Sequence, residues 1–218
     1  MHSYRFLFKT PKGEVPTVSE RAVHRAKKFA ELLKQLRSSI VKPVFESENL
    51  KKELAEIPSK TPYKIIMDKS DYQIYVFHKG KLIKQYSATH GHAFSNEKTK
   101  RKDKATPEGI YFITHHNNKS KYHLSLGISY PNAIDAKAGL DSNIISAAQY
   151  QQIKRRHNAF RKPPQNTALG GDIFIHGESG GKTATIAQWT QGCIRVSNED
   201  IEEIFKIVPN GTGIKIRK

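Results

Sequence analysis

The sequence contains a single cysteine, Cys193, among its 218 residues. One thiol cannot close a disulfide within the chain, so the sequence excludes a disulfide-stabilised scaffold and leaves the redox compartment open. Long apolar runs are also missing. No apolar stretch approaches the roughly 18 residues needed to span a bilayer. The start of the chain, residues 4–8, is too short for the apolar core of a signal peptide. If the protein is exported, we expect this sequence to be a mature or trimmed form.

Acidic residues are scarce, since 20 Asp and Glu face 37 Lys and Arg and leave a net charge of +17. A field of this sign favours a polyanionic partner, such as nucleic acid, an anionic wall polymer, a phospholipid surface or a carboxylate-rich peptide. The sequence carries no helix-turn-helix, zinc-finger or aromatic RNA-binding signature, which argues against nucleic acid. A non-catalytic protein that binds anionic polymers would explain the charge but would leave the residues around Cys193 without a role.

Helical spacing dominates the first sixty residues. Thr17 with Glu20 matches a capping box, and apolar residues then recur at helical spacing up to Ile40. A second short helix contains Leu50 and Leu54 and ends at residue 58, a proline. We therefore predict an N-terminal helical segment, residues 1–60, ahead of a larger domain at residues 61–218.

From residue 63 the apolar pattern changes to a period of two, which is typical of strands. Lys79 and Gly80 predict a tight hairpin. Two helices interrupt the strands, one from about residue 142 to 157 and one that follows a Ser197 cap and ends near Val208. Strands outnumber helices, so we predict a β-rich α+β domain, a mixed sheet or sandwich with few helices. The predicted strands are residues 65–67, 73–78, 81–89, 110–114, 124–128, 173–176 and 213–217.

The strand at residues 173–176 ends in His176. Cys193 lies seventeen residues after His176 and directly follows Gly192. A thiol and a candidate base delivered by a strand end are the minimum for covalent acyl transfer. The backbone N–H groups of Gly192 and Cys193 are candidates to stabilise a tetrahedral oxyanion, and Arg195 is expected to favour the thiolate. The common alternative is that a lone cysteine is a small buried hydrophobe without chemistry.

Residues 175–177 and 190–195 resemble the signature of the L,D-transpeptidase catalytic domain, the YkuD-type fold. Residues 104–111 resemble the Thr-Pro-x-Gly start of a strand in that family. Residues 123–132 and 170–172 resemble a branch of it found in Gram-negative cell envelopes. The resemblance runs from about residue 63 to the C-terminus. Many members of the family carry a histidine directly before the Gly-Cys pair, whereas this sequence has Gln191 there. We expect this difference to affect the choice of acceptor and not the chemistry of the thiol.

The resemblance implies a peptidoglycan substrate. The donor would be a tetrapeptide stem, cut between its third residue and the terminal D-alanine through a Cys193 thioester, with His176 as general base. The carbonyl of Gly177 would hold the other nitrogen of the histidine ring. An amine acceptor would form a cross-link, whereas water would make the protein an L,D-carboxypeptidase, or an amidase if the bond joins an envelope lipoprotein. The sequence leaves these outcomes open.

Four further residues are candidates for substrate contact. His123 and Tyr130 lie in the family-like stretch and are candidates to hydrogen-bond a carboxylate, although His123 is equally explained as a half-buried strand residue. Thr190 is a third candidate for substrate binding, and Arg195 is expected either to pair with a stem carboxylate or to orient its loop. The basic loop at residues 92–104 either steers the substrate or serves solubility alone, and the loop at residues 178–188 is expected to border the site.

Metal chemistry is disfavoured by the histidine spacing. His90, His92, His115 and His116 lack the ligand spacing of a zinc site, so we expect no metal and no cofactor. The resemblance implies a location in the periplasm or cell envelope, with association at the wall or a membrane surface. The sequence does not determine the oligomeric state.

Overall fold

The computed structural model describes residues 48–93, 97–178 and 190–218, which belong to one compact unit. The helix predicted between Thr17 and Ile40 lies outside the described residues, as does almost all of the loop predicted at residues 178–188. The second predicted helix is α2 (Glu48–Ala55), with Leu50 and Leu54 buried. Glu53 of α2 accepts a hydrogen bond from Arg217 at 2.7 Å, which ties the helix to the end of the chain. The boundary between residues 60 and 61 stays a prediction.

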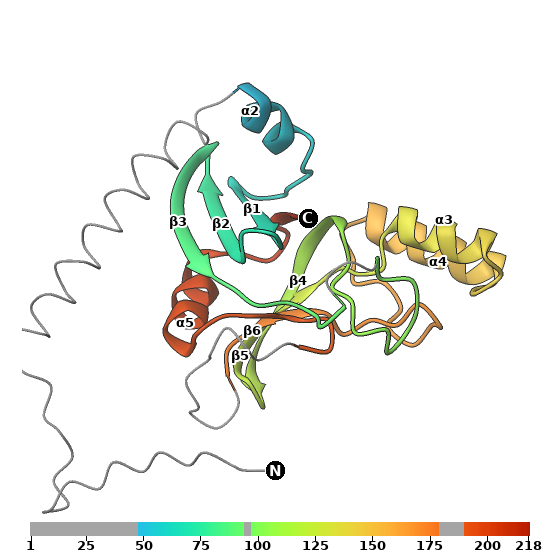
Figure 1. Cartoon of the computed structure of the whole chain (residues 1–218). Coiled ribbons are helices and arrows are strands. Elements are labelled where there is room, and N and C mark those ends of the chain that lie inside the picture. The colour runs from blue at the N-terminus through green and yellow to red at the C-terminus, as the bar shows by residue number, and fades with distance from the viewer. Residues whose placement is uncertain (1–47, 94–96, 179–189) are drawn as a thin grey trace, which may run out of the picture. The chain divides into compact units, whose positions relative to one another are not determined.

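Eight strands form one mixed sheet in the order β3-β2-β1-β8-β4-β5-β6-β7 (Figure 1). The pairs β1/β8 and β6/β7 are parallel, and the other neighbours are antiparallel. The long strand β4 pairs with β8 at its start and with β5 further along, so it joins the two halves of the sheet. The strands are β1 (Tyr63–Asp68), β2 (Gln73–His78), β3 (Lys81–Ser87), β4 (Gly109–Ser120), β5 (His123–Ile128), β6 (Phe174–His176), β7 (Ile194–Arg195) and β8 (Gly213–Arg217).

The main core lies between the curled sheet and the helix α5 (Asn198–Ile207), whose buried residues are Ile201 and Ile204. As predicted, Ser197 caps α5, and its Oγ accepts a hydrogen bond from the Asp200 N–H at 3.0 Å. The strands contribute β-branched and aromatic side chains to this core, as their period-two pattern requires. The fold class is therefore confirmed as a β-rich α+β domain, with a short helix ahead of the sheet.

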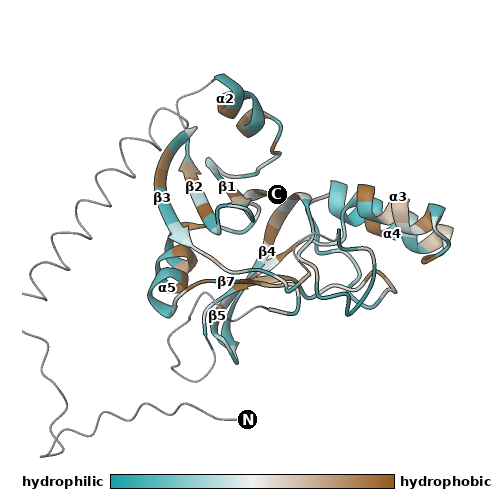
Figure 2. Cartoon of the chain, in the orientation of Figure 1, coloured by the Kyte–Doolittle hydropathy of each residue, from teal (hydrophilic) through white to brown (hydrophobic). Residues whose placement is uncertain are grey.

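The prediction of one helix over residues 142–157 is wrong in extent. The structure has two helices, α3 (Ala133–Asp141) and α4 (Ala147–Asn158), because Ser146 forms a capping box with Gln149 and starts the second helix later. Asn132 and Asp135 form the capping box of α3, a signal that the sequence interpretation overlooked. The two helices project from the strands as a pair with apolar bands of their own (Figure 2). Their small separate core consists of Ala136, Ile145, Ile153 and Leu169.

Within the described residues, no helix is both long enough and apolar enough to cross a membrane.

Candidate active site

The parallel pair β6/β7 brings the candidate base and the candidate nucleophile onto neighbouring strands. His176 is paired with Arg195 in the register, and Cys193 lies two residues before Arg195, just ahead of β7. Side chains alternate along a strand, so Cys193 and Arg195 point to the same face as His176. The register therefore sets Cys193 and His176 diagonally across adjacent strands.

His176 is held in one orientation by its own backbone neighbour. Its side chain is buried, with the residue 5% exposed, and Nδ1 lies 2.6 Å from the Gly177 carbonyl oxygen. This is the contact that the resemblance implies. A carbonyl can only accept, so Nδ1 carries the hydrogen and Nε2 of the neutral ring is left as the basic nitrogen. Burial lowers the pKa of His176, and the charges of Arg195 and Lys121 lower it further against the opposing bond to Gly177.

Tyr122 covers one face of the His176 ring. The two rings are stacked, with centroids 4.4 Å apart and planes inclined by 24°. Tyr122 ends the turn between β4 and β5, and the sequence analysis did not single it out. Its only signal was its place directly before the family-like stretch that starts at His123.

Cys193 is half-buried, and its thiol donates to the Asp172 carbonyl oxygen at 3.5 Å. Burial raises the pKa of Cys193, and the negative charge of Asp172 adds to this. The Phe174 backbone and the charges of Lys98 and Lys121 oppose the rise in pKa. Burial thus shifts both pKa values in the direction that disfavours a thiolate–imidazolium pair.

The turn that carries Cys193 is fastened by Thr190. Its Oγ1 donates to the Cys193 carbonyl oxygen at 2.5 Å and accepts the Gly192 N–H at 3.1 Å. The stabilisation of an oxyanion by the Gly192 N–H stays a prediction, and in this structure that donor is already used inside the turn. The Thr190 hydroxyl is occupied in the same way, and its predicted contact with a substrate stays a prediction. The Cys193 N–H has no hydrogen-bond partner in the part of the chain that the structure describes.

Arg195 is placed differently from what we expected. Its backbone exchanges two hydrogen bonds of 2.8 Å with Thr89. The positive charges that lower the Cys193 pKa come from Lys98 and Lys121, whereas Arg195 lowers the pKa of His176. Burial lowers the pKa of Arg195 itself, and the buried Glu178 opposes this. The charge of Arg195 therefore acts on the pKa of His176 and interacts with Glu178. It is not among the charges that act on the pKa of the Cys193 thiol.

His123 and Tyr130, the two candidates from the family-like stretch, have their hydrogen bonds with other parts of the protein. Tyr130 is fully buried, and its hydroxyl donates to the Leu169 carbonyl oxygen at 3.1 Å. Its predicted contact with a substrate stays a prediction, and in this structure such a contact would require the core to open. His123 is exposed, and its Nε2 lies 2.8 Å from Glu202 Oε1 on α5. Its predicted contact with substrate stays a prediction.

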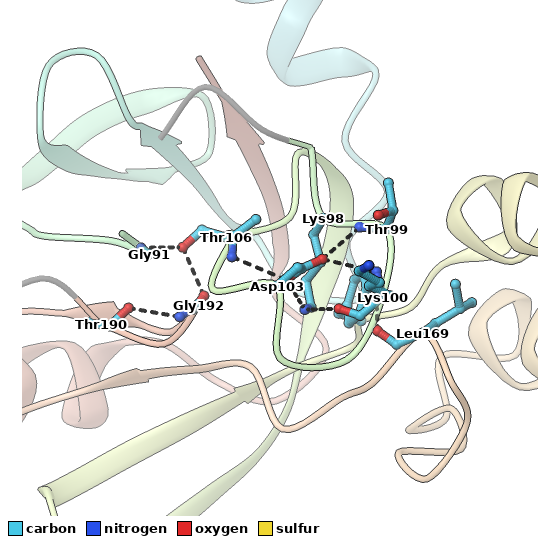
Figure 3. Close-up of polar contacts among 11 residues, drawn as sticks. Gly91, Lys98, Thr99, Lys100, Asp103, Thr106, Leu169, Thr190 and Gly192 are labelled. Carbon is cyan, nitrogen blue, oxygen red and sulfur yellow. Dashed lines mark hydrogen bonds and ion pairs between the residues drawn. The ribbon is translucent and has the colours of Figure 1, made fainter. Parts of the chain in front are cut away.

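Thr106 is a site residue that the sequence analysis missed as such. Its Oγ1 accepts the Gly91 N–H and donates to the Gly192 carbonyl oxygen, both at 2.8 Å (Figure 3). The signal was present in the Thr-Pro-x-Gly motif, which we interpreted only as the start of a strand. In the adjacent loop, Asp103 accepts from the Lys98 ammonium and from the N–H groups of Thr99 and Lys100 (Figure 3).

The histidines considered as metal ligands have other contacts. His90 Nδ1 lies 3.1 Å from the Gly91 carbonyl, His115 Nδ1 lies 2.7 Å from Thr114 Oγ1, and His116 Nδ1 lies 2.7 Å from Asn210 Oδ1. Across the described ranges, no group of three or more His, Cys, Asp or Glu residues is arranged to hold a metal ion.

Comparison with protein families identifies one family for this chain. The sequence profile of YkuD, the L,D-transpeptidase catalytic domain, matches residues 62–216. A sequence search among curated proteins finds no match.

Several solved structures are similar to this chain at low sequence identity. The helical cell shape determining protein Pgp2 from Campylobacter jejuni is 19% identical, with a TM-score of 0.50 over 74% of this chain and 50% of that one. Bd1075 from Bdellovibrio bacteriovorus is 23% identical, with a TM-score of 0.48 over 74% of this chain and 51% of its own. An L,D-transpeptidase from Mycobacterium smegmatis is 10% identical, with a TM-score of 0.43 over 72% and 59%. The chain thus spans about half the length of the first two structures. With the profile covering most of its length, it belongs to the YkuD family of L,D-transpeptidase catalytic domains.

Proposed function

We propose that this protein is a cysteine acyltransferase, an L,D-transpeptidase that acts on peptidoglycan tetrapeptide stems through a Cys193 thioester. One observation carries the proposal. The β6/β7 register sets Cys193 diagonally across from a histidine whose Nδ1 is committed to the Gly177 carbonyl, which leaves Nε2 as a base. Membership of the family supports the substrate class.

The chemistry follows from the two side chains. His176 Nε2 takes the proton of the Cys193 thiol as the sulfur attacks the carbonyl carbon of the third stem residue. The carbonyl electrons move onto oxygen, which the Cys193 N–H stabilises, and then return to expel the amine of D-alanine. Protonated His176 gives its proton to that amine, and a thioester remains. An acceptor amine then attacks the thioester, forms an amide and releases the thiol.

Burial dictates when the proton moves. The pKa of Cys193 is raised and that of His176 is lowered, so a preformed thiolate–imidazolium pair is disfavoured at neutral pH. Proton transfer is therefore coupled to attack on the carbonyl rather than completed beforehand. This pattern resembles a serine hydrolase more than a cysteine site with a standing thiolate.

The alternative is hydrolysis by the same site. If water resolves the thioester, the protein is an L,D-carboxypeptidase, or a murein–lipoprotein amidase when the bond cut joins a lipoprotein. The described residues give no contact that separates an amine acceptor from water. The outcome depends on access to the thioester, which the two catalytic side chains do not control.

Mass spectrometry of muropeptides tests the proposal. Purified protein and Cys193→Ala protein are incubated with tetrapeptide muropeptides. Cross-linked dimers that require Cys193 would support the transpeptidase, and tripeptides that require Cys193 would support the hydrolase. Equal products, or none, from both proteins would refute the proposal.

Surface charge supports association with the cell envelope, specifically with its anionic wall polymers. Residues 142–171 contain no Asp or Glu, and Lys154, Arg155 and Arg156 are exposed on α4. Among the described residues none of these three forms an ion pair. Exposed cations that no carboxylate neutralises are available to polyanions, and their attraction is screened by salt.

Sedimentation with isolated sacculi tests this association. Replacing Lys154, Arg155 and Arg156 by Gln should reduce binding and flatten its dependence on salt. The matched control removes the same charge from exposed Lys52, Lys79 and Lys81 and should have less effect. Binding that is insensitive to salt, or equal loss in both triple variants, would contradict the assignment.

A further inference from the structure

The turn at residues 190–193, here called the nucleophile turn, packs its backbone directly against the segment at residues 104–106. Gly192 has φ of +124°, and a Cβ at this position would lie 2.7 Å from the Ala105 carbonyl oxygen. A Cβ at Gly91 would collide with the Lys104 carbonyl oxygen. Both glycines are therefore needed for the close approach of this segment, and Thr106 ends up between them.

The Thr106 hydroxyl has no freedom left in this position. The residue is 1% exposed, and its oxygen accepts the Gly91 N–H at 2.8 Å. Its single hydrogen must then go to the Gly192 carbonyl oxygen, also at 2.8 Å. Figure 3 shows this bridge from Gly91 through Thr106 to Gly192. Because both bonds are buried, breaking either one leaves a polar backbone group unpaired.

This bridge orients the backbone donor of the turn that stays without a partner among the described residues. The Gly192 carbonyl and the Cys193 N–H belong to one planar trans peptide unit, so they point in opposite directions. Holding the Gly192 oxygen against Thr106 directs the Cys193 N–H away from Thr106. The Thr190 hydroxyl holds the two flanking peptide units, through the Gly192 N–H and the Cys193 carbonyl. Of the three peptide units around the nucleophile, only the middle one keeps a donor without a partner in the described chain.

We propose that Thr106 is a positioning residue that aims the Cys193 N–H at the oxyanion formed during acyl transfer. The proposal rests on the proposed acyl-transfer function and deepens it, because it replaces two expected oxyanion donors by one and names the side chain that holds it. Thr106 acts through the Gly192 peptide and does not itself touch the reacting atoms. Removing one oxyanion donor outright typically lowers the rate by about 10²–10³-fold. Loosening its support should cost less, about tenfold to a hundredfold.

The test compares two reagents that attack the same sulfur. p-Nitrophenyl acetate acylates a thiol through a tetrahedral oxyanion, whereas iodoacetamide alkylates it by displacement without one. Cys193 is the only cysteine, so the Cys193→Ala protein gives the background for both reagents. Thr106→Val removes the hydroxyl at nearly constant shape, and Thr106→Ser retains it. We expect acylation of Thr106→Val to fall by about tenfold or more while alkylation changes by less than about twofold.

Controls separate positioning from general loosening. Thr106→Ser should restore the acylation rate to within about threefold of the wild type. Thr61→Val, which removes a part-buried hydroxyl bonded to Thr212 Oγ1 at 2.9 Å, should change neither reaction. Equal losses of acylation and alkylation in Thr106→Val, or no loss of either, would overturn the proposal. So would failure of Thr106→Ser to recover.

Neither reagent resembles peptidoglycan, so this test is separate from the test of the natural substrate. A selective loss of acylation together with no action on muropeptides would contradict the substrate but not the role of Thr106. A wild-type thiol that alkylates but never acylates would overturn the role of Thr106 and leave the substrate to the muropeptide test.

Discussion

Two His-Gly pairs in this protein have nearly the same local geometry. The ring Nδ1 of His90 lies 3.1 Å from the Gly91 carbonyl, and that of His176 lies 2.6 Å from the Gly177 carbonyl. Each ring is stacked on a tyrosine. Tyr72 lies over His90 at 5.2 Å and 19°, and Tyr122 lies over His176 at 4.4 Å and 24°. Burial lowers the pKa of both histidines.

The two pairs differ in what lies beside them. His176 ends β6, next to the strand that Cys193 precedes. His90 is fully buried, and its backbone carbonyl accepts the Thr190 N–H at 3.0 Å, beneath the nucleophile turn. A histidine held by the next carbonyl and covered by a tyrosine is therefore a neutral, oriented imidazole, but not by itself a catalytic base. We propose that the neighbouring strand decides whether such an imidazole acts as a base or only supports the turn.

The largest expected effect is a difference in kcat between variants of the two histidines. His176→Gln removes the base and should lower kcat by about 10²–10⁴-fold. His90→Gln should lower it by less than about tenfold, because it alters only the support of the turn. Steady-state assay with muropeptides or p-nitrophenyl acetate measures both. Similar losses in the two variants would mean that the comparison assigns the roles wrongly.

The pH dependence should belong to only one of the pairs. Because the pKa of His176 is lowered, the acid limb of kcat/KM should fall below pH 6.5 and persist in His90→Gln. Because the pKa of Cys193 is raised above its ordinary 9.0, iodoacetamide alkylation should still be rising at pH 9. From pH 7 to 9 the thiolate fraction increases about a hundredfold. An alkylation plateau near neutral pH would instead indicate a standing thiolate.

Stability should respond to His90 more than turnover does. His90→Gln loses a buried ring and its contacts and should destabilise the fold by about 1–3 kcal/mol at pH 7.5. The folded-state pKa of His90 is lowered, so its contribution is present above the unfolded pKa of about 6.5 and is lost as pH falls through the folded value. The difference between wild type and variant should therefore shrink at pH 5. Urea unfolding at both pH values measures it, and a difference that grows in acid would contradict the assignment.

The smallest effect should come from the stacked tyrosines. Tyr122→Leu should change kcat/KM by about twofold to tenfold and shift its acid limb, because the ring covers the face of His176. Tyr72→Leu should leave the acid limb in place and lower the melting temperature. A shift of the acid limb in Tyr72→Leu would remove the distinction between the two pairs.

Much of the fold could be read from local patterns. Period-two alternation predicted seven of the eight strands but missed the short β7 and the second half of β4. Ser197 before an apolar helical repeat predicted α5, because caps and amphipathic faces are properties of neighbouring residues. The helix pair α3/α4 was only half predicted. Asn132 with Asp135 is as local a signal as Ser197, but weak apolar periodicity in residues 133–141 concealed it. The missed helix reflects an overlooked cap rather than a long-range effect.

The candidate site divides in the same way. Cys193 beside Gly192, and His176 at a strand end beside Gly177, are visible in the sequence because each pair consists of adjacent residues. Tyr130 could not be placed, since only packing shows that its hydroxyl is used by the Leu169 carbonyl.

The sequence by itself therefore determined the class of fold and the family, and it supplied the pair of residues that we propose for acyl transfer. Tertiary structure alone decided which donors are left for that chemistry. Thr106 meets Gly192 across 86 positions of the chain, and Lys98 and Lys121 act on the thiol pKa where Arg195 was expected. A hydrogen bond saturates one donor and one acceptor, and charges act through space. Both effects depend on distances that exist only once the chain has folded.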